Sequence, residues 1–128
     1  MYTILVVDDE KDIVSALEIY LKAEGYRVLT AYNGREALSV AAREDVHLIL
    51  MDIMMPVMNG YAATEAIRNM DRPDAKTVPI IAMSANAFQD DIQKSLSVGM
   101  NDHLPKPLTT EKLLSTVAGF VQKKPGNV

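Results

Sequence analysis

Short runs of apolar residues alternate with helical patterns along the chain. Runs of about four to six mostly apolar residues between turn signals are typical of buried parallel strands, and we expect such strands at 3–7, 26–31, 47–51 and 79–83. A further short strand is expected at 102–105. Between them, apolar residues recur three and four positions apart, as on amphipathic helices, and we expect helices at 12–24, 34–44, 60–69, 86–98 and 109–120. Five strand–helix units with short loops predict an α/β fold, a parallel sheet with helices on both faces.

Length and composition fit one folded domain. With 128 residues, 48% of them hydrophobic, the chain can bury a substantial core. We expect this domain to span residues 1–121. Residues 122–128 are mostly polar and are expected to form a tail or the stub of a linker.

Charge and residue types argue against several classes of function. The net charge of −4, without a Lys/Arg cluster, argues against nucleic acid as a direct partner. The lack of cysteine leaves no disulfide framework and no thiolate metal site, which suits the cytoplasm. The apolar runs fall far short of the roughly 20 residues that span a bilayer, and the chain does not open on a signal-peptide pattern. A soluble, cytoplasmic domain without membrane insertion is expected.

Polar side chains stand where four of the predicted strands end. The pair Asp8-Asp9 follows the first strand, Asp52 the third, Ser84 the fourth and Lys106 the fifth. Parallel strands end on one side of a sheet, where open α/β folds bind ligands, so an acidic pocket with one cation is expected. Each residue has a structural alternative, since the acid pair could cap the first helix and Lys106 could be an ordinary surface lysine. The presence of all these polar side chains at the same end of the predicted sheet favours a functional site.

Four motifs resemble the receiver domain of two-component response regulators in order and spacing. They are Val-Asp-Asp-Glu at 7–10, Leu-Met-Asp-Ile-Met-Met-Pro at 50–56 with Asn-Gly at 59–60, Ala-Met-Ser-Ala at 82–85, and Leu-Pro-Lys-Pro at 104–107. The resemblance covers essentially the whole chain. The stretches 84–87 and 99–104 are most similar to receivers of hybrid sensor histidine kinases. A kinase-attached and a free-standing receiver both remain open.

The resemblance implies a fold, a reaction and a cofactor. The fold is the doubly wound, flavodoxin-like (CheY-like) sheet of five strands in the order 2-1-3-4-5. In the reaction, Asp52 accepts a phosphoryl group from a histidine kinase or a histidine phosphotransfer domain. The cofactor is Mg²⁺, a hard cation that oxygen ligands bind and that offsets the charge of the transferring phosphoryl group. The implied metal ligands are Asp9, Asp52 and the main-chain oxygen of Met54, with Asp8 acting through a water.

The resemblance also assigns the residues that respond to phosphorylation. Lys106 would neutralise a phosphoryl oxygen, Ser84 would donate a hydrogen bond to another, and the small Ala85 would leave the site open. Ser84 and His103 would be the switch residues, and the face formed by 86–98, 102–105 and 109–120 would change. The family usually carries Tyr or Phe where this chain has His103. The alternative is a buried histidine whose hydrogen bonds are satisfied and which has no signalling role. The bond between Lys106 and Pro107 is expected to be cis.

Partner docking is expected on the first helix and after the last strand. The helix carries a core stripe and, beside it, a second apolar stripe of Ile13, Ala16 and Tyr20. Similar receivers dock a four-helix phosphotransfer module there, with residues that correspond to Pro107 and Leu108. Wider burial of the second stripe is the alternative. The apolar loop 55–58 either contacts a partner or fills the core. The downstream effector is unknown. The domain is expected to be a monomer or a weak phosphorylation-dependent dimer.

Other functions fit the sequence less well. A haloacid-dehalogenase-like phosphatase would place a second acid two residues after Asp52, where this chain has Met54. A phosphorylation-independent interaction module would be expected to lack Asp52, Asp9 or Lys106, and all three are present. A flavin or nucleotide module would need a Gly-rich phosphate loop, which the chain lacks. We therefore expect a phosphoacceptor domain rather than an enzyme that acts on other substrates. Such a domain catalyses only its own aspartyl phosphorylation and dephosphorylation.

Overall fold

Strands and helices alternate along the chain in the computed structural model, which describes residues 1–85 and 89–121. The elements are β1 (Thr3–Val7), α1 (Lys11–Ala23), β2 (Arg27–Ala31), α2 (Gly34–Arg43), β3 (Leu48–Asp52), α3 (Gly60–Arg68), β4 (Ile80–Ser84), α4 (Gln89–Val98), β5 (Asp102–Pro105) and α5 (Thr110–Val121). Each corresponds to a predicted strand or helix. The predicted start of α4 at residue 86 and the predicted tail at 122–128 lie outside the described residues. Within them, no helix has the length and apolarity needed to cross a membrane.

Hydrogen bonds explain why two helices begin elsewhere than predicted. α1 begins one residue before the predicted position 12, because the carbonyl of Glu10 already accepts from the backbone N–H of Ile13 and Val14, both at 3.1 Å. Thr109 was predicted to open the last helix and is instead its cap, since its Oγ1 accepts from the backbone N–H of Lys112 at 3.1 Å. Such caps satisfy donors that a helix start leaves unpaired.

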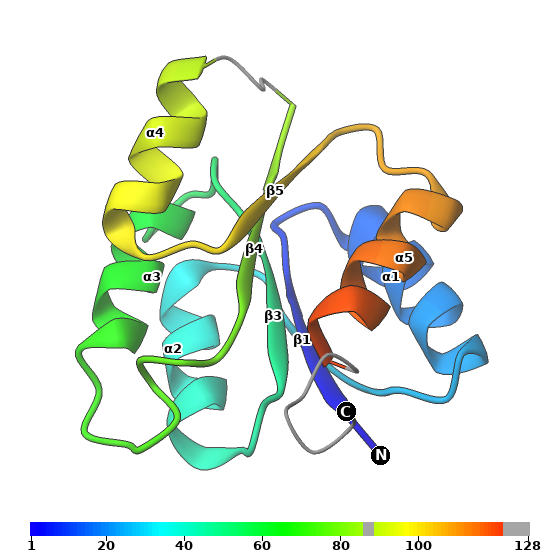
Figure 1. Ribbon diagram of the computed structural model, residues 1–128, viewed down its shortest axis with the longest axis horizontal. Helices are drawn as coiled ribbons and strands as arrows, with labels where there is room; N and C mark the ends of the chain where they lie inside the picture. Colours follow the sequence, from blue (N-terminus) through cyan, green and yellow to red (C-terminus); the bar gives the residue numbers. More distant parts are fainter. Residues whose placement is uncertain (86–88, 122–128) are drawn as a thin grey trace.

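The five strands form one parallel sheet in the order β2-β1-β3-β4-β5. α1 and α5 cover one face, and α2, α3 and α4 cover the other (Figure 1). This confirms the predicted doubly wound, flavodoxin-like (CheY-like) fold and its strand order. Because all strands run the same way, their carboxyl ends lie together at the top of Figure 1. We call this side of the molecule the carboxyl end of the sheet, and the opposite side the amino end.

Two hydrophobic layers hold the helices on the sheet. Ile4 and Val6 of β1 point into the layer beneath α1 and α5, whereas Leu5 and Val7 point into the layer beneath α2 and α3. β1, β3 and β4 are buried at every position. This two-sided burial explains why their sequences are continuous apolar runs rather than alternating patterns.

Arg68 ties three segments together at the amino end of the sheet. It lies at the end of α3 and donates hydrogen bonds to the carbonyl of Val78 at 2.7 Å and to that of Gly99 at 2.7 Å. Further bonds reach the carbonyl of Ala75 at 3.1 Å and the Oδ1 of Asn101 at 2.8 Å. α3, the α3–β4 loop and the loop before β5 are therefore joined through one side chain.

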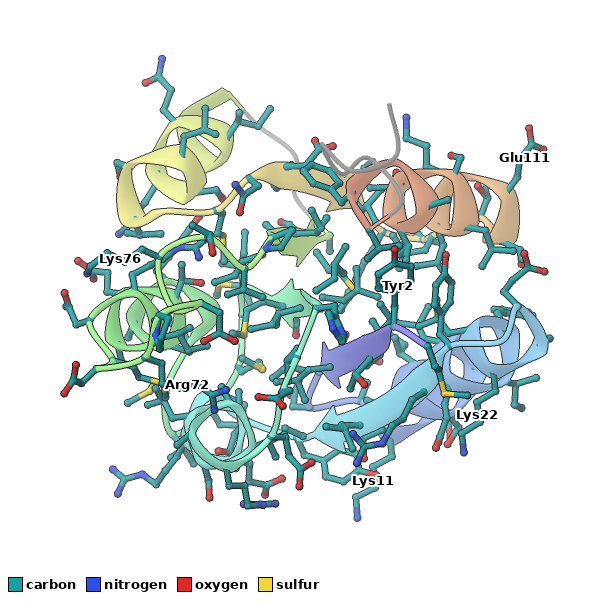
Figure 2. The ribbon with its side chains drawn as sticks, turned by 60° about the horizontal axis from the view of Figure 1, so that its bottom comes forward. Tyr2, Lys11, Lys22, Arg72, Lys76 and Glu111 are labelled. Carbon is teal, nitrogen blue, oxygen red and sulfur yellow. The ribbon has the colours of Figure 1, made fainter. Side chains whose placement is uncertain are left out.

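Arg72 closes the end of α2 in a similar way, as Figure 2 shows from the amino end. Its Nη1 donates to the carbonyl oxygens of Ala41, Ala42 and Glu44 at 2.8 to 3.1 Å. Its Nη2 pairs with the carboxylate of Asp45 at 2.9 Å. The last carbonyls of a helix have no intrahelical donor, so this arginine from the α3–β4 loop caps α2 from outside.

Candidate functional site

The acid pair after β1 occupies the centre of the carboxyl end. Asp8 is fully buried and Asp9 is exposed. The backbone N–H of Asp8 donates to the carbonyl of Ala31 at 3.2 Å, which extends the pairing of β1 with β2 by one residue. One carboxylate oxygen of Asp8 accepts from the backbone N–H of Glu10 at 3.0 Å. These bonds hold the loop against the sheet, with Asp8 turned inward.

Asp52, the last residue of β3, completes an acidic cluster with this pair. Its side chain is almost fully buried. Asp8, Asp9 and Asp52 each offer a carboxylate oxygen, and these oxygens lie within 4.8 Å of one another, the only such set of possible metal ligands among the described residues. The expected gathering of these carboxylates at one end of the sheet is thus present in the structure.

Lys106 supplies the only cation in contact with these carboxylates among the described residues. Its Nζ lies 2.8 Å from Asp8 Oδ2, 3.3 Å from Asp52 Oδ1 and 4.0 Å from Glu10 Oε1. The backbone N–H of Lys106 donates to the carbonyl of Ser84 at 2.7 Å, and the peptide bond to Pro107 is cis, as predicted. Burial lowers the pKa of Lys106, but the ion pairs with Asp8 and Asp52 outweigh it and raise the pKa above its ordinary value.

Negative charge exceeds positive charge in this cluster. Burial, followed by the nearby Asp8 carboxylate, raises the pKa of Asp52 to about 7, although Lys106 acts in the opposite direction. Exposed Asp9 adds a smaller repulsion of the same sign. A bound cation would relieve this repulsion. Clustered carboxylate oxygens are the ligands that Mg²⁺ prefers, so the residues present fit a magnesium ion.

Gly60 fixes the backbone at Asp52. The backbone N–H of Gly60 donates to the carbonyl of Ile53 at 2.9 Å, and Asn59 caps α3 by accepting from Ala62 at 2.9 Å. A Cβ on Gly60 would collide with the carbonyl oxygen of Asp52 and would lie 2.9 Å from the Cα of Ile53. Only glycine allows α3 to begin this close to the end of β3.

The methionine-rich loop after β3 divides into buried and exposed residues. Met51 is fully buried and Met55 is buried, and Met58 packs on the core from a half-buried position. In contrast, the side chain of Met54 is 77% exposed and that of Val57 is 72% exposed. Within 55–58, Met55 and Met58 therefore pack on the core and Val57 presents an apolar side chain to the surface, and partner contact there stays a prediction.

The two predicted switch residues lie on neighbouring strands. Ser84 is buried at the end of β4, one residue beyond the position that pairs with Asp52. His103 lies in β5 opposite Ala82 and is half-buried, on the face covered by α2, α3 and α4. Its buried Nε2 has no hydrogen-bond partner in the described part of the chain, which differs from the alternative of a fully satisfied core histidine.

A groove lies beside Lys106, between α1 and the chain that follows β5. Its volume is about 430 Å³. It is lined by Ile13, Ala16, Leu17, Tyr20, Ala85, Lys106, Pro107 and Leu108, a set that contains all the residues predicted to dock a partner. Val14, Leu17 and Leu21 form the buried core stripe of α1. The second stripe is only partly buried, and Tyr20 is 42% exposed, which argues against its being simply a wider core face.

Comparison with known proteins assigns the family. The sequence matches the model of the response regulator receiver domain over residues 4–118, so the chain belongs to this family. Receiver domains of two-component systems accept a phosphoryl group as a signalling switch and interact with histidine kinases.

Curated relatives and solved structures agree with this assignment. The transcriptional regulatory protein PrrA of Mycobacterium bovis is 36% identical over 121 residues, which cover 94% of this chain and 50% of PrrA. The response regulator SaeR of Staphylococcus aureus is 35% identical over 123 residues, covering 96% of this chain and 52% of SaeR. The chain thus spans about half the length of the curated relatives it matches.

Two solved structures are similar over nearly their whole length. The chemotaxis protein CheY4 of Vibrio cholerae has a TM-score of 0.88 and 33% identity, with 94% of this chain and 98% of CheY4 covered. The receiver domain of the sensor histidine kinase PA1611 from Pseudomonas aeruginosa has a TM-score of 0.87 and 37% identity, with 95% and 98% covered. The PA1611 structure has a magnesium ion coordinated in its active site cleft.

Proposed function

We propose that Asp52 accepts a phosphoryl group from a phosphohistidine of a partner protein. The observation that carries this proposal is the position of its carboxylate, within 4.8 Å of those of Asp8 and Asp9 and 3.3 Å from the ammonium of Lys106. In the attack, a carboxylate oxygen of Asp52 forms the new P–O bond while the bond from phosphorus to the histidine nitrogen breaks. The acid cluster and the lysine provide the charge environment for this transfer.

We assign the magnesium ligands as Asp9, Asp52 and the main-chain carbonyl of Met54. When bound, Mg²⁺ offsets the negative charge on the phosphoryl oxygens. Asp8 has both carboxylate oxygens engaged, one by the Glu10 N–H and the other by Lys106, and this supports its contact with the metal through a water. The magnesium ion in the PA1611 receiver, 37% identical to this chain, supports the choice of metal.

Lys106 and Ser84 would respond to the phosphoryl group on Asp52. Lys106 already reaches Asp52 and can transfer its ion pair to a phosphoryl oxygen. Ser84, at the end of the neighbouring strand, would donate to another. His103 lies in β5 on the face beneath α4, so movement at Ser84 would reach the surface formed by α4, β5 and α5, which we propose as the signalling face.

The groove between α1 and the chain after β5 is the proposed docking site for the histidine partner. It places Ile13, Ala16, Pro107 and Leu108 directly beside Lys106. An apolar groove next to the reacting carboxylate suits the helix that carries the phosphohistidine in a kinase or phosphotransfer domain.

We assign this function to a receiver domain that spans residues 1–121. A receiver of a hybrid sensor kinase and a free-standing response regulator both fit, because the similar proteins include a sensor kinase receiver and regulators. We place the reaction in the cytoplasm. A phosphorylation-independent interaction module is the alternative function.

Intact-mass measurement after incubation with Mg²⁺ and a small phosphodonor tests the phosphoacceptor. Wild type should gain one phosphoryl group, and Asp52→Asn should gain none. Asp71→Asn, an exposed residue on the α3–β4 loop, is the matched control and should label like wild type. Labelling of Asp52→Asn would move the acceptor to another residue, and no labelling of wild type would favour the alternative function.

Docking is tested by comparing two phosphodonors. Ile13→Glu should slow transfer from a phosphorylated histidine phosphotransfer domain at least tenfold, because it puts an uncompensated carboxylate into the apolar groove. Its labelling by the small donor should remain near that of wild type. Ile19→Glu is the matched control, since Ile19 lies on the same helix, is 66% exposed and lies outside the groove. Equal slowing with both donors would place the docking surface elsewhere.

A further inference from the structure

The turn between β2 and α2 contacts the loop after β1, which carries Asp8 and Asp9, and the loop that follows Asp52. At its start, the carbonyl of Ala31 accepts from the backbone N–H of Asp8 at 3.2 Å. At its end, the backbone N–H of Gly34 donates to the carbonyl of Met58 at 3.1 Å. The turn contributes no carboxylate to the cluster, yet it links the loop after β1 to the loop after β3.

This turn is itself rigidly held by a reciprocal cap. Asn33 Oδ1 accepts from the backbone N–H of Glu36 at 2.9 Å, and Glu36 Oε1 accepts from the backbone N–H of Tyr32 at 3.0 Å. The pair satisfies donors at the start of α2 from both sides. The position of Gly34 is therefore set by α2, independently of the loop that it touches.

Gly34 approaches Met58 too closely for any side chain. A Cβ at Gly34 would lie 2.5 Å from the carbonyl oxygen of Met58, 2.8 Å from its Cγ and 2.9 Å from its Cβ. One of these partners is backbone, which cannot rotate away as a side chain can. Any other residue at position 34 would displace the loop after β3.

The loop held in this way contains a strained turn. The backbone N–H of Met58 donates to the carbonyl of Pro56 at 2.7 Å, and Val57 between them has a φ of 69°. A positive φ is unfavourable for a β-branched residue and persists only where the surroundings enforce it. The bond from Gly34 supplies such a constraint on one side of the turn, and the bond from Gly60 to Ile53 closes the loop on the other.

We propose that Gly34 is a positioning residue for the magnesium site. By holding Met58, it fixes the loop that carries the Met54 carbonyl, while the same turn holds Asp8 through Ala31. The distance between the loop after β1, which carries Asp9, and the loop after β3, which carries Met54, is thereby held constant. This inference rests on the proposed function, because it takes the Met54 carbonyl as a metal ligand.

A magnesium titration followed by amide NMR shifts tests the proposal. Gly34→Ala should bind Mg²⁺ about tenfold more weakly than wild type, the usual effect of losing a group that orients a metal ligand. Gly119→Ala adds the same methyl group where no atom lies within 4 Å and should bind as wild type does. Ile67→Val, a change in the buried core, controls for loss of stability alone and should also leave the affinity unchanged.

The outcomes separate this inference from the proposed function. If Asp9→Asn abolishes Mg²⁺ binding but Gly34→Ala binds like wild type, the positioning role is wrong and the metal site stands. If wild type and Asp9→Asn respond alike to Mg²⁺, the metal site itself is wrong and the inference falls with it.

Hydrogen exchange in wild type gives a second test that does not depend on the folding of a variant. Because coupling is reciprocal, Mg²⁺ should slow exchange of the Gly34 amide several-fold more than that of the Glu44 amide. The Glu44 N–H bonds to Val40 at the far end of α2 and reports the general stabilisation by bound metal. Equal slowing of both amides would contradict the proposal.

Discussion

The two ends of the sheet use buried charge in opposite ways. At the amino end, Arg68 and Arg72 direct their guanidinium groups at backbone carbonyls of neighbouring segments. At the carboxyl end, Asp8 and Asp52 are buried side by side and share the single cation of Lys106. At one end the charged groups meet hydrogen-bond acceptors, whereas the other end retains repulsion between like charges.

The difference shows how stability and reactivity are distributed over the domain. Burial lowers the pKa of Arg68 from its ordinary value, but its hydrogen bonds to carbonyls compensate for part of the lost hydration. At Asp52 the ion pair with Lys106 does not outweigh burial and the nearby Asp8 carboxylate, so its pKa rises to about 7. Perturbed carboxylates and backbone strain typically collect at functional sites and depend on a stable surrounding structure. The amino end and the two core layers form that structure here.

The largest change in the free energy of unfolding is expected for a substitution at the amino end. Arg68→Met should lower the free energy of unfolding by about 3 kcal/mol, because charged hydrogen bonds contribute about 1.5–3 kcal/mol each and water can replace some of them. Urea denaturation measures the change, and Mg²⁺ affinity should remain within about twofold of wild type because the metal site lies at the other end. Arg35→Met, at an exposed position on α2, should change stability by less than about 0.5 kcal/mol. Tenfold weaker Mg²⁺ binding by folded Arg68→Met would show that the two ends are not separable.

A smaller change in the free energy of unfolding, in the stabilising direction, is expected for a substitution at the carboxyl end. Asp52→Asn should stabilise the metal-free protein by about 2 kcal/mol at pH 8. A rise of about three pKa units corresponds to roughly 4 kcal/mol at about 1.4 kcal/mol per unit, and relaxation and water penetration around the buried charge reduce this by about half. The pKa of Asp52 is raised in the folded state from 3.8 to about 7, so wild type loses stability from this group as the pH rises through that window. The advantage of the variant should therefore shrink toward pH 4.

Thermal unfolding in a chelator, measured between pH 4 and pH 8, tests this pH dependence. Asp71→Asn again serves as the control and should show no such trend. Saturating Mg²⁺ should stabilise wild type more than Asp52→Asn, since the variant has lost a metal ligand. A constant difference between Asp52→Asn and wild type across the pH range would show that charge repulsion at Asp52 is not its cause.

The strand order was predicted only from the resemblance to the receiver family. Local sequence patterns were sufficient to predict the strands and the meeting of three carboxylates with Lys106. These features depend on hydrophobic periodicity and on the geometry of parallel strands. The arginine contacts at the amino end could not be predicted in this way. Residues 70–74 read as a plain polar loop, because nothing local indicates that Arg72 reaches the end of α2, about 30 positions earlier in the chain.

Gly34 illustrates the same limit within the candidate site. The pair Asn33-Gly34 indicates a turn or a helix cap, and in the structure Asn33 caps α2, which begins at Gly34. Its contact with Met58 becomes visible only when the strand order places the end of β2 near the loop after β3. Such a role depends on tertiary distances that a turn signal does not encode.

The smallest effect is expected at the strained turn beside Asp52. Val57→Asn should stabilise the domain by about 1 kcal/mol, because Asn tolerates a positive φ whereas a β-branched residue resists it. Val57 is 72% exposed, so little packing is lost. Val57→Thr keeps the β-branch and should leave the free energy of unfolding within about 0.5 kcal/mol of wild type. Denaturant unfolding of the two variants separates strain from surface hydrophobicity, since both changes reduce apolar exposure but only Asn relieves the backbone. An equal gain in stability for Thr and Asn would assign the effect to exposed apolar surface and remove strain from the description of the carboxyl end.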